Sequence, residues 1–283
     1  FGVCENGAKP VRRQAIRKSW GRNKPVYFLV AGNWESVSKE FGSFGDLLFV
    51  DIPEDYRNAL TPKTFAFIQF ASQKAIPAFS QTGNHRPMEY MFKTDDDVYI
   101  NATEMSLELY AHGRPDYYGL MRNGTAPIRN KTEDGLLSKW YMRQEEYPHD
   151  VFPPYAHGTG YALSKRFGDC ASKAMATILP MPWEDVATGL LAEVCQVDAT
   201  PSNKDWGAVL GWEEIYAFPY DRFKNGNALI KIQHKVHPWF FEPLSRQASL
   251  KGARKLWKQS IKKKERERRK RRRKANATTS TAT

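Results

Sequence analysis

Three consecutive aspartates, Asp95, Asp96 and Asp97, lie between apolar, β-prone stretches at residues 90–92 and 98–100. The apolar flanks predict a buried strand that presents the triplet at the carboxyl-terminal edge of a sheet. Alternate residues of an extended chain point to opposite faces, so Asp95 and Asp97 share one side. Oxygen ligands at this spacing suit a hard divalent ion, and burying them without a counter-charge is costly. The pattern therefore predicts a metal site that binds a diphosphate, rather than a solvated turn.

Two further carboxylates, Glu184 and Asp185, follow Pro182 and Trp183 at the expected start of a helix that runs to Cys195. The N-terminus of a helix favours anions, so it would tend to keep Asp185 ionised, as a general base must be. Carboxylates are also common at helix starts for structural reasons alone. The sequence leaves both roles open for this pair.

Glycines and histidines mark two other candidate positions. Gly158 and Gly160 allow the backbone to approach a ligand closely, or else let a turn pack tightly against the sheet. Residues 229–237 predict a strand that carries His234 and His237. A histidine after a β run, in a protein with an acidic metal site, is a candidate third ligand, and these two histidines are rivals for that role.

Strands and helices alternate along the first half of the chain. This alternation predicts an α/β fold, with a doubly wound, mostly parallel central sheet, helices on both faces and the site at the strand carboxyl ends. The predicted strands are residues 26–31, 47–52, the stretch before the aspartates and 117–120, and the predicted helices are residues 11–20, 60–76 (with Thr61 as N-cap and Pro77 at its end) and 103–112.

The middle of the chain has a different character. Residues 121–150 are polar and have no clear period, which predicts a long surface segment of the kind that shapes a substrate cleft. Ser164 is the expected N-cap of the helix that follows.

The cysteines and the N-glycosylation sequons bear on the compartment. Three cysteines are too few for a disulfide scaffold, but Cys170 and Cys195 can pair if their Cα atoms come within about 7 Å. Buried free thiols are the alternative. Four sequons suit a secretory-pathway lumen, although Asn101 lies close to the aspartates; they begin at Asn101, Asn123, Asn130 and Asn276.

The positive charge of the chain is confined to one end. Residues 251–274 hold 15 Lys or Arg against 2 Asp or Glu, whereas the remaining 28 basic and 29 acidic residues nearly cancel. Residues 251–283 therefore predict a basic, disordered tail that is solvated or that binds RNA, anionic membrane or acidic glycans. The basic isoelectric point says nothing about the ligand of the core.

Five groups of residues, in register over residues 11–238, resemble the β-1,3-glycosyltransferases of glycosyltransferase family 31, the galactosyl and N-acetylglucosaminyl transferases of the Golgi. Each group alone is a weak signal, and the five together are specific. They are residues 12–21; residues 44–51 with Tyr56, Asn58, Leu60, Thr61, Lys63 and Thr64; residues 93–98; Pro153, Pro154 and Tyr155 with Gly158, Gly160, Tyr161 and Ser164; and Glu184, Asp185, Val186 and Gly189. Pro62 and His157 depart from the usual pattern.

The resemblance implies a GT-A fold over residues 1–250, with a nucleotide-binding half (1–120) and an acceptor-binding half (121–250), Mn²⁺ as cofactor and a UDP-hexose as donor. By position it implies these roles: Asp97 and His234 as metal ligands; Asp95 and Asp96 at the ribose or a metal-bound water; Arg12, Arg13 and Arg17 near UDP; Tyr155, Gly158, Gly160, Trp183 and Glu184 at the substrates; and Asp185 as the catalytic base.

The implied reaction inverts the configuration of an α-linked UDP-sugar to give a β-1,3 linkage, so one base suffices to deprotonate the acceptor hydroxyl. The expected acceptor is a glycan on a glycoprotein or glycolipid. The expected location is the Golgi lumen, with a membrane anchor upstream of Phe1. No nucleic-acid partner is expected.

Two other classes remain as alternatives. A metal-dependent phosphoester hydrolase would also use an acidic strand end, but it calls for further carboxylates or histidines around a second metal. A nucleic-acid-binding protein would act through the basic tail, with binding that is sensitive to salt.

Overall fold

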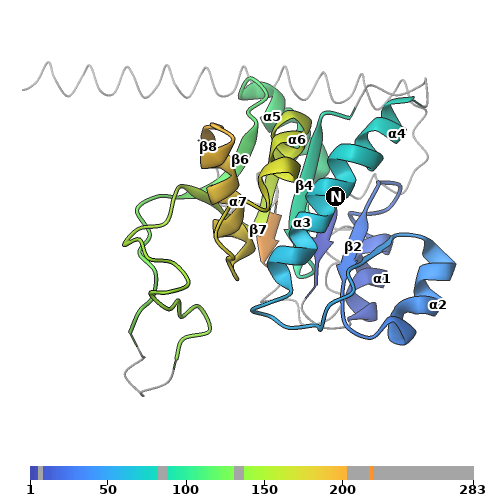
Figure 1. Cartoon of the computed structure of the whole chain (residues 1–283). Helices are drawn as coiled ribbons and strands as arrows, with labels where there is room; N and C mark the ends of the chain where they lie inside the picture. The colour runs from blue at the N-terminus through green and yellow to red at the C-terminus, as the bar shows by residue number, and fades with distance from the viewer. Residues whose placement is uncertain (6–8, 82–87, 131–136, 203–216, 220–283) are drawn as a thin grey trace, which may run out of the picture. The chain divides into compact units, whose positions relative to one another are not determined.

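The computed structural model describes residues 1–5, 9–81, 88–130, 137–202 and 217–219 (Figure 1). The chain divides into two compact units, Phe1–Val236 and His237–Thr283, and every described residue belongs to the first. The predicted histidine strand at 229–237 and the basic tail at 251–283 lie outside the described residues. Those two expectations, and the predicted domain boundary, therefore stay predictions.

The chain folds around a sheet of seven strands: β1 (Gly2–Cys4), β2 (Tyr27–Val30), β3 (Leu47–Phe49), β4 (Tyr90–Asp95), β6 (Tyr117–Arg122), β7 (Tyr155–Ser164) and β8 (Ala199–Pro201). Their order is β3-β2-β1-β4-β7-β6-β8, and only β7 runs antiparallel to its neighbours, β4 and β6. Two short strands, β5 (Val98–Ile100) and β9 (Ala217–Pro219), pair separately. The fold is α/β with a mostly parallel central sheet, as predicted, and is consistent with a Rossmann-like GT-A fold.

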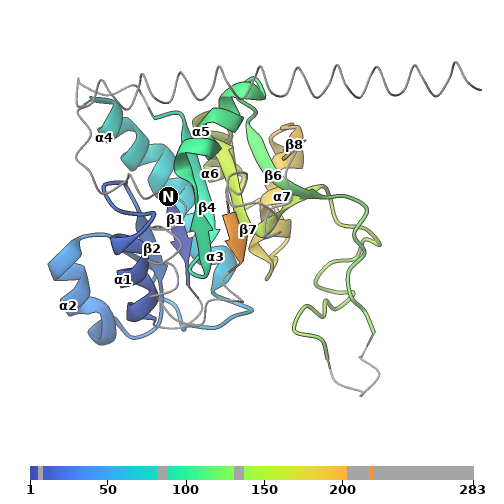
Figure 2. The same cartoon turned by 180° about the vertical axis from the view of Figure 1, so that it is seen from behind.

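Helices cover both faces of the sheet, as Figures 1 and 2 show from opposite sides. None of the helices in the described part of the chain has the length and apolar character needed to cross a bilayer. One core packs the sheet against α1 (Pro10–Lys18), α2 (Trp34–Phe44) and α5 (Ala102–Ala111), and the other packs it against α3 (Leu60–Phe70), α4 (Ile76–Gln81), α6 (Lys165–Ala174) and α7 (Glu184–Val194).

Successive side chains along each strand point alternately into the two cores. Val3 belongs to the core under α1, and the next residue, Cys4, belongs to the core under α3. Met91 and Phe92 in β4 divide in the same way. Because successive strand side chains point to opposite faces, a run that is apolar at every position is needed to bury the sheet on both sides. That pattern is what predicted the strands.

The structure corrects the helix predicted over residues 60–76. Its N-cap is Ala59, and Thr61 lies inside the first turn. The helix also continues past Pro77, through a π-helical stretch at Ala71–Ala75 and into α4. Proline lacks the N–H of a regular ladder, but the wider π turn just before it has already interrupted that ladder, so the chain passes through.

Helix α2 was not predicted, although two parallel strands require a crossover between them. Asn33 caps the helix by accepting a hydrogen bond from the Glu35 amide at 2.8 Å. Gly45 ends it in the left-handed region, at φ 64°. Both are recognisable signals, and they identify the crossover between β2 and β3.

The segment between β6 and β7 has a small core of its own. In its described residues, 123–130 and 137–154, the β pairing is an isolated bridge between Ile128 and Tyr141, in agreement with the predicted lack of regular structure. Arg129 donates hydrogen bonds to the carbonyl oxygens of Met142 at 2.9 Å and of Tyr147 at 2.5 Å. Buried apolar side chains from this segment pack against the start of α7 and Tyr56. The segment is therefore fixed beside the first turn of α7.

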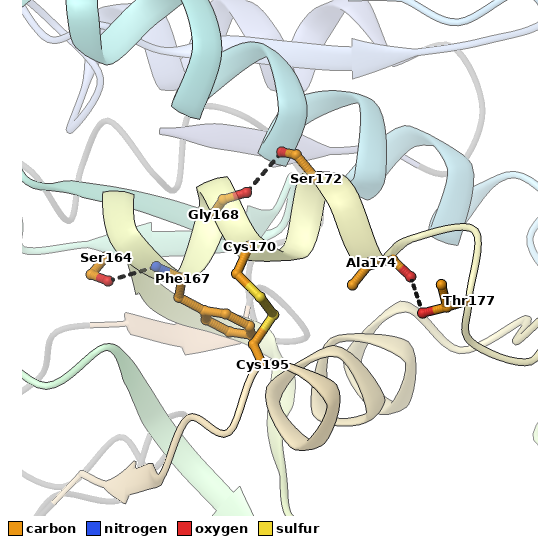
Figure 3. Close-up of a disulfide and its surroundings, with 8 residues drawn as sticks. All are labelled: Ser164, Phe167, Gly168, Cys170, Ser172, Ala174, Thr177 and Cys195. Carbon is orange, nitrogen blue, oxygen red and sulfur yellow. Dashed lines mark hydrogen bonds between the residues drawn. A yellow bond between two sulfur atoms is a disulfide. The ribbon is translucent and has the colours of Figure 1, made fainter.

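Cys170 on α6 and Cys195 after α7 form a disulfide, with their Cα atoms 6.0 Å apart (Figure 3). The structure thus resolves the alternative that the sequence left open in favour of pairing. Cys4 is a buried free cysteine. Ser164 caps α6 as predicted, because its hydroxyl accepts a hydrogen bond from the Phe167 amide at 3.1 Å (Figure 3).

Candidate active site

The acidic triplet lies where the strand order of the sheet reverses. Strand β1 has β2 on one side and β4 on the other, and ligands of open α/β sheets bind in the crevice at such a switch point. Asp95, the last residue of β4, is in register with Cys4, the last residue of β1. The Asp96 amide donates to the Cys4 carbonyl at 3.1 Å. The predicted position at a strand carboxyl end is confirmed.

Asp96 and Asp97 face the start of helix α1. Arg12 Nη1 lies 2.6 Å from Asp96 Oδ1 and 3.7 Å from Asp97 Oδ2. The Asp96 side chain is buried, and its Oδ2 accepts no hydrogen bond, although Lys9 Nζ lies 3.9 Å away. Asp97 keeps 35% of its side chain exposed. Of the three arginines expected near UDP, Arg12 is therefore the one that contacts the triplet.

Arg13 and Arg17 lie in a set of ion pairs on the far side of α1. Arg13 is buried and contacts Glu5 at 2.6 Å and Glu40 at 2.5 Å. Arg17 contacts Glu40 and Asp46, each at 2.7 Å. These bonds hold α1 against α2 and the start of β3. The contact of Arg13 and Arg17 with a nucleotide stays a prediction.

Lys93 connects the triplet to the second acidic pair. Its buried ammonium donates to Asp95 Oδ1 and to the Gly158 carbonyl, each at 2.7 Å, and also to Glu184 Oε1. Burial alone would lower the pKa of Lys93, but the carboxylates of Asp95 and Glu184 raise it well above its usual value. Lys93 is therefore charged, and it joins the end of β4 to the first turn of α7.

Glu184 and Asp185 begin α7, as predicted. Gly158 of β7 faces both of them, because a Cβ added to Gly158 would lie 3.0 Å from Glu184 Oε1 and 3.6 Å from Asp185 Oδ2. A larger residue there would press on the carboxylates. Gly158 thus permits the close approach expected of it, although the approaching groups are the protein's own carboxylates and the glycine lies in a strand rather than in a turn.

Asp185 is half-buried, and burial together with the neighbouring Glu184 charge raises its pKa. The expected effect of the helix N-terminus was the opposite, namely to keep this group ionised. The Val186 amide donates to Asp185 Oδ1 at 2.8 Å, but this single bond does not offset the loss of solvent and the like charge. A carboxylate with a raised pKa is a stronger base, which suits proton abstraction near neutral pH.

Of the remaining residues predicted to contact substrates, Gly160 serves the packing of the sheet, whereas Trp183 and Tyr155 lie beside the acidic pair. A Cβ on Gly160 would lie 2.9 Å from Phe92, so this glycine allows β7 to pack on β4. Trp183, the N-cap of α7, is almost buried, with its ring centroid 6.3 Å from that of Tyr56 and 5.1 Å from the Arg57 guanidinium. Tyr155 is half-buried at the start of β7. Trp183 and Tyr155 flank the acidic pair.

Among the described residues, the cations that pair with the carboxylates of this region are fewer than the carboxylates themselves. Lys9, Arg12 and Lys93 lie within ion-pair distance of Asp95, Asp96, Asp97 or Glu184, and Asp185 lies beside Glu184. The excess of hard oxygen donors and the unsatisfied Asp96 Oδ2 fit a divalent cation chemically. No group of three or more His, Cys, Asp or Glu side chains among the described residues is arranged to hold a metal. His234 and His237 lie outside that part of the chain.

Lys93 is the site residue that sequence reasoning missed. Lys93 lies within the motif at residues 93–98, but no function was predicted for it. The available signal was its position two residues before Asp95, which places both side chains on the same face of one strand. A lysine at an otherwise apolar buried strand position requires a partner as much as the aspartates do.

A family model described as galactosyltransferase matches residues 11–203. Human β-1,3-galactosyltransferase 4 is 29% identical, over 84% of this chain and 69% of that protein. β-1,3-Galactosyltransferase 5 of Pan paniscus is 30% identical, over 68% of this chain and 63% of that protein. UDP-GalNAc:β-1,3-N-acetylgalactosaminyltransferase 1 of Sus scrofa is 28% identical, over 69% and 60%.

The chain thus spans between three fifths and seven tenths of these relatives. Among solved structures, 4-diphosphocytidyl-2C-methyl-D-erythritol synthase from Anaerococcus prevotii aligns over 71% of this chain and 84% of that one. Its TM-score is 0.36 and its identity 10%, a likeness too low to bear on function.

Proposed function

Because the chain belongs to the galactosyltransferase family, we propose that it transfers galactose or N-acetylglucosamine from a UDP-sugar to a glycan hydroxyl in β-1,3 linkage, with inversion. Family membership makes it a hexosyltransferase. One observation carries the finer proposal. Lys93 bonds both Asp95, the first residue of the acidic triplet, and Glu184, beside Asp185, so two acidic loci far apart in the sequence meet at one lysine.

In this proposal Asp185 is the general base. Its carboxylate accepts the proton of the acceptor hydroxyl while that oxygen bonds to the anomeric carbon and the bond from that carbon to UDP breaks. Attack from the face opposite UDP converts the α-linked donor into a β-linked product. Lys93 fixes Glu184 beside this base, and the raised pKa of Asp185 makes it a better proton acceptor.

The donor diphosphate is placed at the acidic triplet on the side of Arg12, whose guanidinium already lies beside Asp96 and Asp97. Asp97, with Asp95 and Asp96 next to it, is the proposed binding position for Mn²⁺, and His234 is the proposed ligand from outside the described residues. When bound, the ion would neutralise charge that develops on the leaving diphosphate.

The proposed location is the Golgi lumen. The Cys170–Cys195 disulfide supports an oxidising compartment. Among the sequons, Asn123 is exposed, whereas Asn101 is buried with 5% exposure. Expression of the native gene in cultured cells should therefore give a glycan on Asn123 and none on Asn101, as read by peptide mass spectrometry. An unmodified Asn123 in that protein would count against lumenal passage.

The catalytic proposal is tested with purified protein, Mn²⁺, a panel of UDP-sugars and acceptor glycans. Replacing Asp185 by Asn should lower turnover about a thousandfold and leave UDP binding nearly unchanged, because a general base acts on the transition state. Glu193→Gln, an exposed carboxylate on the same helix, is the matched control and should change neither quantity. Equal loss of turnover and UDP binding in Asp185→Asn would remove the base assignment. Sugar release without acceptor would favour a hydrolase.

A further inference from the structure

A line of aromatic side chains runs from the acidic pair to the surface. Trp183 precedes Glu184 and is 7% exposed, Tyr56 is half-buried beside it, and Trp140 is 51% exposed. We propose that Trp140 and Lys139, together with Tyr56, form the subsite for the acceptor glycan, where a pyranose ring of the acceptor packs against the Trp140 indole. This inference rests on the proposed transferase function.

The contacts along this line are continuous. The Tyr56 and Trp183 ring centroids are 6.3 Å apart. Lys139 Nζ lies 5.5 Å from the centroid of Tyr56 and 4.2 Å from that of Trp140. Burial and the charges of Asp95 and Glu184 raise the pKa of Tyr56, as expected for a phenol that adjoins the acidic site.

The exposed end of the line is held in place by the body of the protein. Arg57 donates to the Tyr141 carbonyl at 2.8 Å and to Glu146 at 2.6 Å, which ties the segment carrying Trp140 to the loop carrying Tyr56. The Arg57 guanidinium also stacks over Trp183. Because the backbone directly after Trp140 is anchored to Arg57, the indole is held near Tyr56, which lowers the entropic cost of binding a ligand.

The chemistry of these side chains fits a sugar. One face of a pyranose ring is a patch of C–H bonds that packs on an aromatic face, while its hydroxyls accept hydrogen bonds from an ammonium such as Lys139. The exposed indole and the lysine therefore offer both kinds of contact together.

The position favours the acceptor over the donor. The diphosphate is assigned to Arg12 and the triplet, on the α1 side of β4, whereas Trp140 reaches the site through Tyr56 and Trp183 on the α7 side. Asp185 follows Trp183 by two residues. A sugar on Trp140 thus approaches the base from the side away from Arg12, as an attacking hydroxyl must.

Binding is measured without turnover, by saturation-transfer NMR with methyl β-galactoside and methyl β-N-acetylglucosaminide in the presence of UDP and Mn²⁺. Trp140→Ala should weaken the binding of at least one glycoside about tenfold, and Lys139→Met should weaken it less. Trp34→Ala, a tryptophan of similar exposure (43%) on α2, is the matched control and should have no effect. Equal binding by Trp140→Ala and wild type, or no binding of either glycoside by wild type, overturns the subsite.

Kinetics separate this inference from the function on which it rests. In the transfer assay Trp140→Ala should raise the acceptor KM about tenfold and leave the donor KM unchanged. Transfer that proceeds with an unaltered acceptor KM in Trp140→Ala would refute the subsite while the transferase stands. Glycoside binding that depends on Trp140, in a protein that transfers no sugar, would refute the transferase while the subsite stands.

Discussion

Two clusters of partly buried charge, one on helix α1 and one at the end of strand β4, differ in how their carboxylates are paired with cations. In the cluster on helix α1, each arginine guanidinium bonds two carboxylates. In the cluster at the end of strand β4, a single lysine ammonium bonds two carboxylates and a third lies beside them. The helix-α1 cluster consists of Arg13, Arg17, Glu5, Glu40 and Asp46, and the strand-β4 cluster of Lys93, Asp95, Glu184 and Asp185.

Within the helix-α1 cluster, Arg13 and Arg17 each donate three hydrogen bonds to carboxylates. Burial alone would raise the pKa of Glu40, but its bonds to the two arginines lower it overall. Glu5 is the exception, because burial raises its pKa to about 7 and its second oxygen accepts no hydrogen bond. The cluster as a whole favours the charged state and holds α1 in place.

In the strand-β4 cluster, Lys93 bonds two carboxylates, and Asp185 is left with a raised pKa beside Glu184. Such a cluster has a charge still to be matched, and it lies at the crevice of the sheet. The difference teaches that burial of charge does not by itself mark a site. In the helix-α1 cluster every carboxylate bonds an arginine, whereas no cation among the described residues bonds Asp185, and this difference supports the proposed catalytic role of the strand-β4 cluster.

The largest effect is expected from Lys93→Met. Removing the ammonium leaves the buried Glu184 and the partly exposed Asp95 without a counter-charge, which should cost about 3 kcal/mol of unfolding free energy. Turnover should fall about a hundredfold or more, because the first turn of α7 loses its tie to β4. Urea unfolding and the transfer assay measure the two effects.

A second variant keeps this test informative if the first folds poorly. Lys93→Met/Glu184→Gln removes the orphaned charge and should recover much of the lost stability, while turnover stays low. Lys74→Met, an exposed lysine of the π-helical stretch, should change neither quantity. Full turnover in the double variant would show that the strand-β4 cluster is structural after all.

Arg13→Met makes the opposite prediction for the helix-α1 cluster. It should cost about 3 kcal/mol of unfolding free energy, because Glu5 and Glu40 lose a buried partner. Turnover per folded molecule should stay within about twofold of wild type. Arg22→Met, at an exposed position, is the control for loss of one positive charge. A selective rise in the donor KM would instead place Arg13 at the nucleotide, as the family resemblance suggests.

Local patterns in the sequence predicted most of the fold. Apolar runs gave the strands, because a sheet buried on both faces needs apolar residues throughout. The triplet was identified because carboxylates between apolar stretches carry a cost when buried, and Asp185 was identified by its place at a helix start and by the family resemblance. The predicted end of the helix at Pro77 was wrong. The rule that proline ends a helix assumes regular α-helical hydrogen bonds before it, and the π-helical turn at Ala71–Ala75, which interrupts them, has no local signature in the sequence.

The partners within the site were less predictable. The Lys93–Glu184 bond spans 91 positions, and only the strand order brings those residues together. The same holds for Arg12 with Asp96, 84 positions apart, and for Arg13 with Glu40. Three arginines within six residues look alike in sequence, and only packing shows that Arg12 faces the triplet while Arg13 and Arg17 face α2.

Asp185→Asn should stabilise the fold even as it removes turnover. A carboxyl whose folded pKa is raised above its ordinary 3.8 binds protons more tightly in the folded state, so its ionisation lowers stability as pH rises above that value. The neutral amide avoids this loss, and the gain at pH 7 should be on the order of 1 kcal/mol. Thermal melts between pH 4 and pH 8 measure it, with Glu193→Gln flat as the control. A variant less stable than wild type at pH 7 would contradict a mismatched cluster.

Glu40→Gln should give the smallest effect, with the opposite sign. Because the folded pKa of Glu40 is lowered below its ordinary 4.5, its stabilisation is present above that value and is lost as pH falls through the folded pKa. The variant should therefore be about 1 kcal/mol less stable than wild type at pH 7, and the two should converge in acid. Urea unfolding at pH 7 and near pH 3 tests this, with the exposed Glu35→Gln on the same helix as control. If the difference between Glu40→Gln and wild type did not shrink in acid, Glu40 would not owe its stabilising effect to its charge, and the contrast between the two clusters would rest on packing instead.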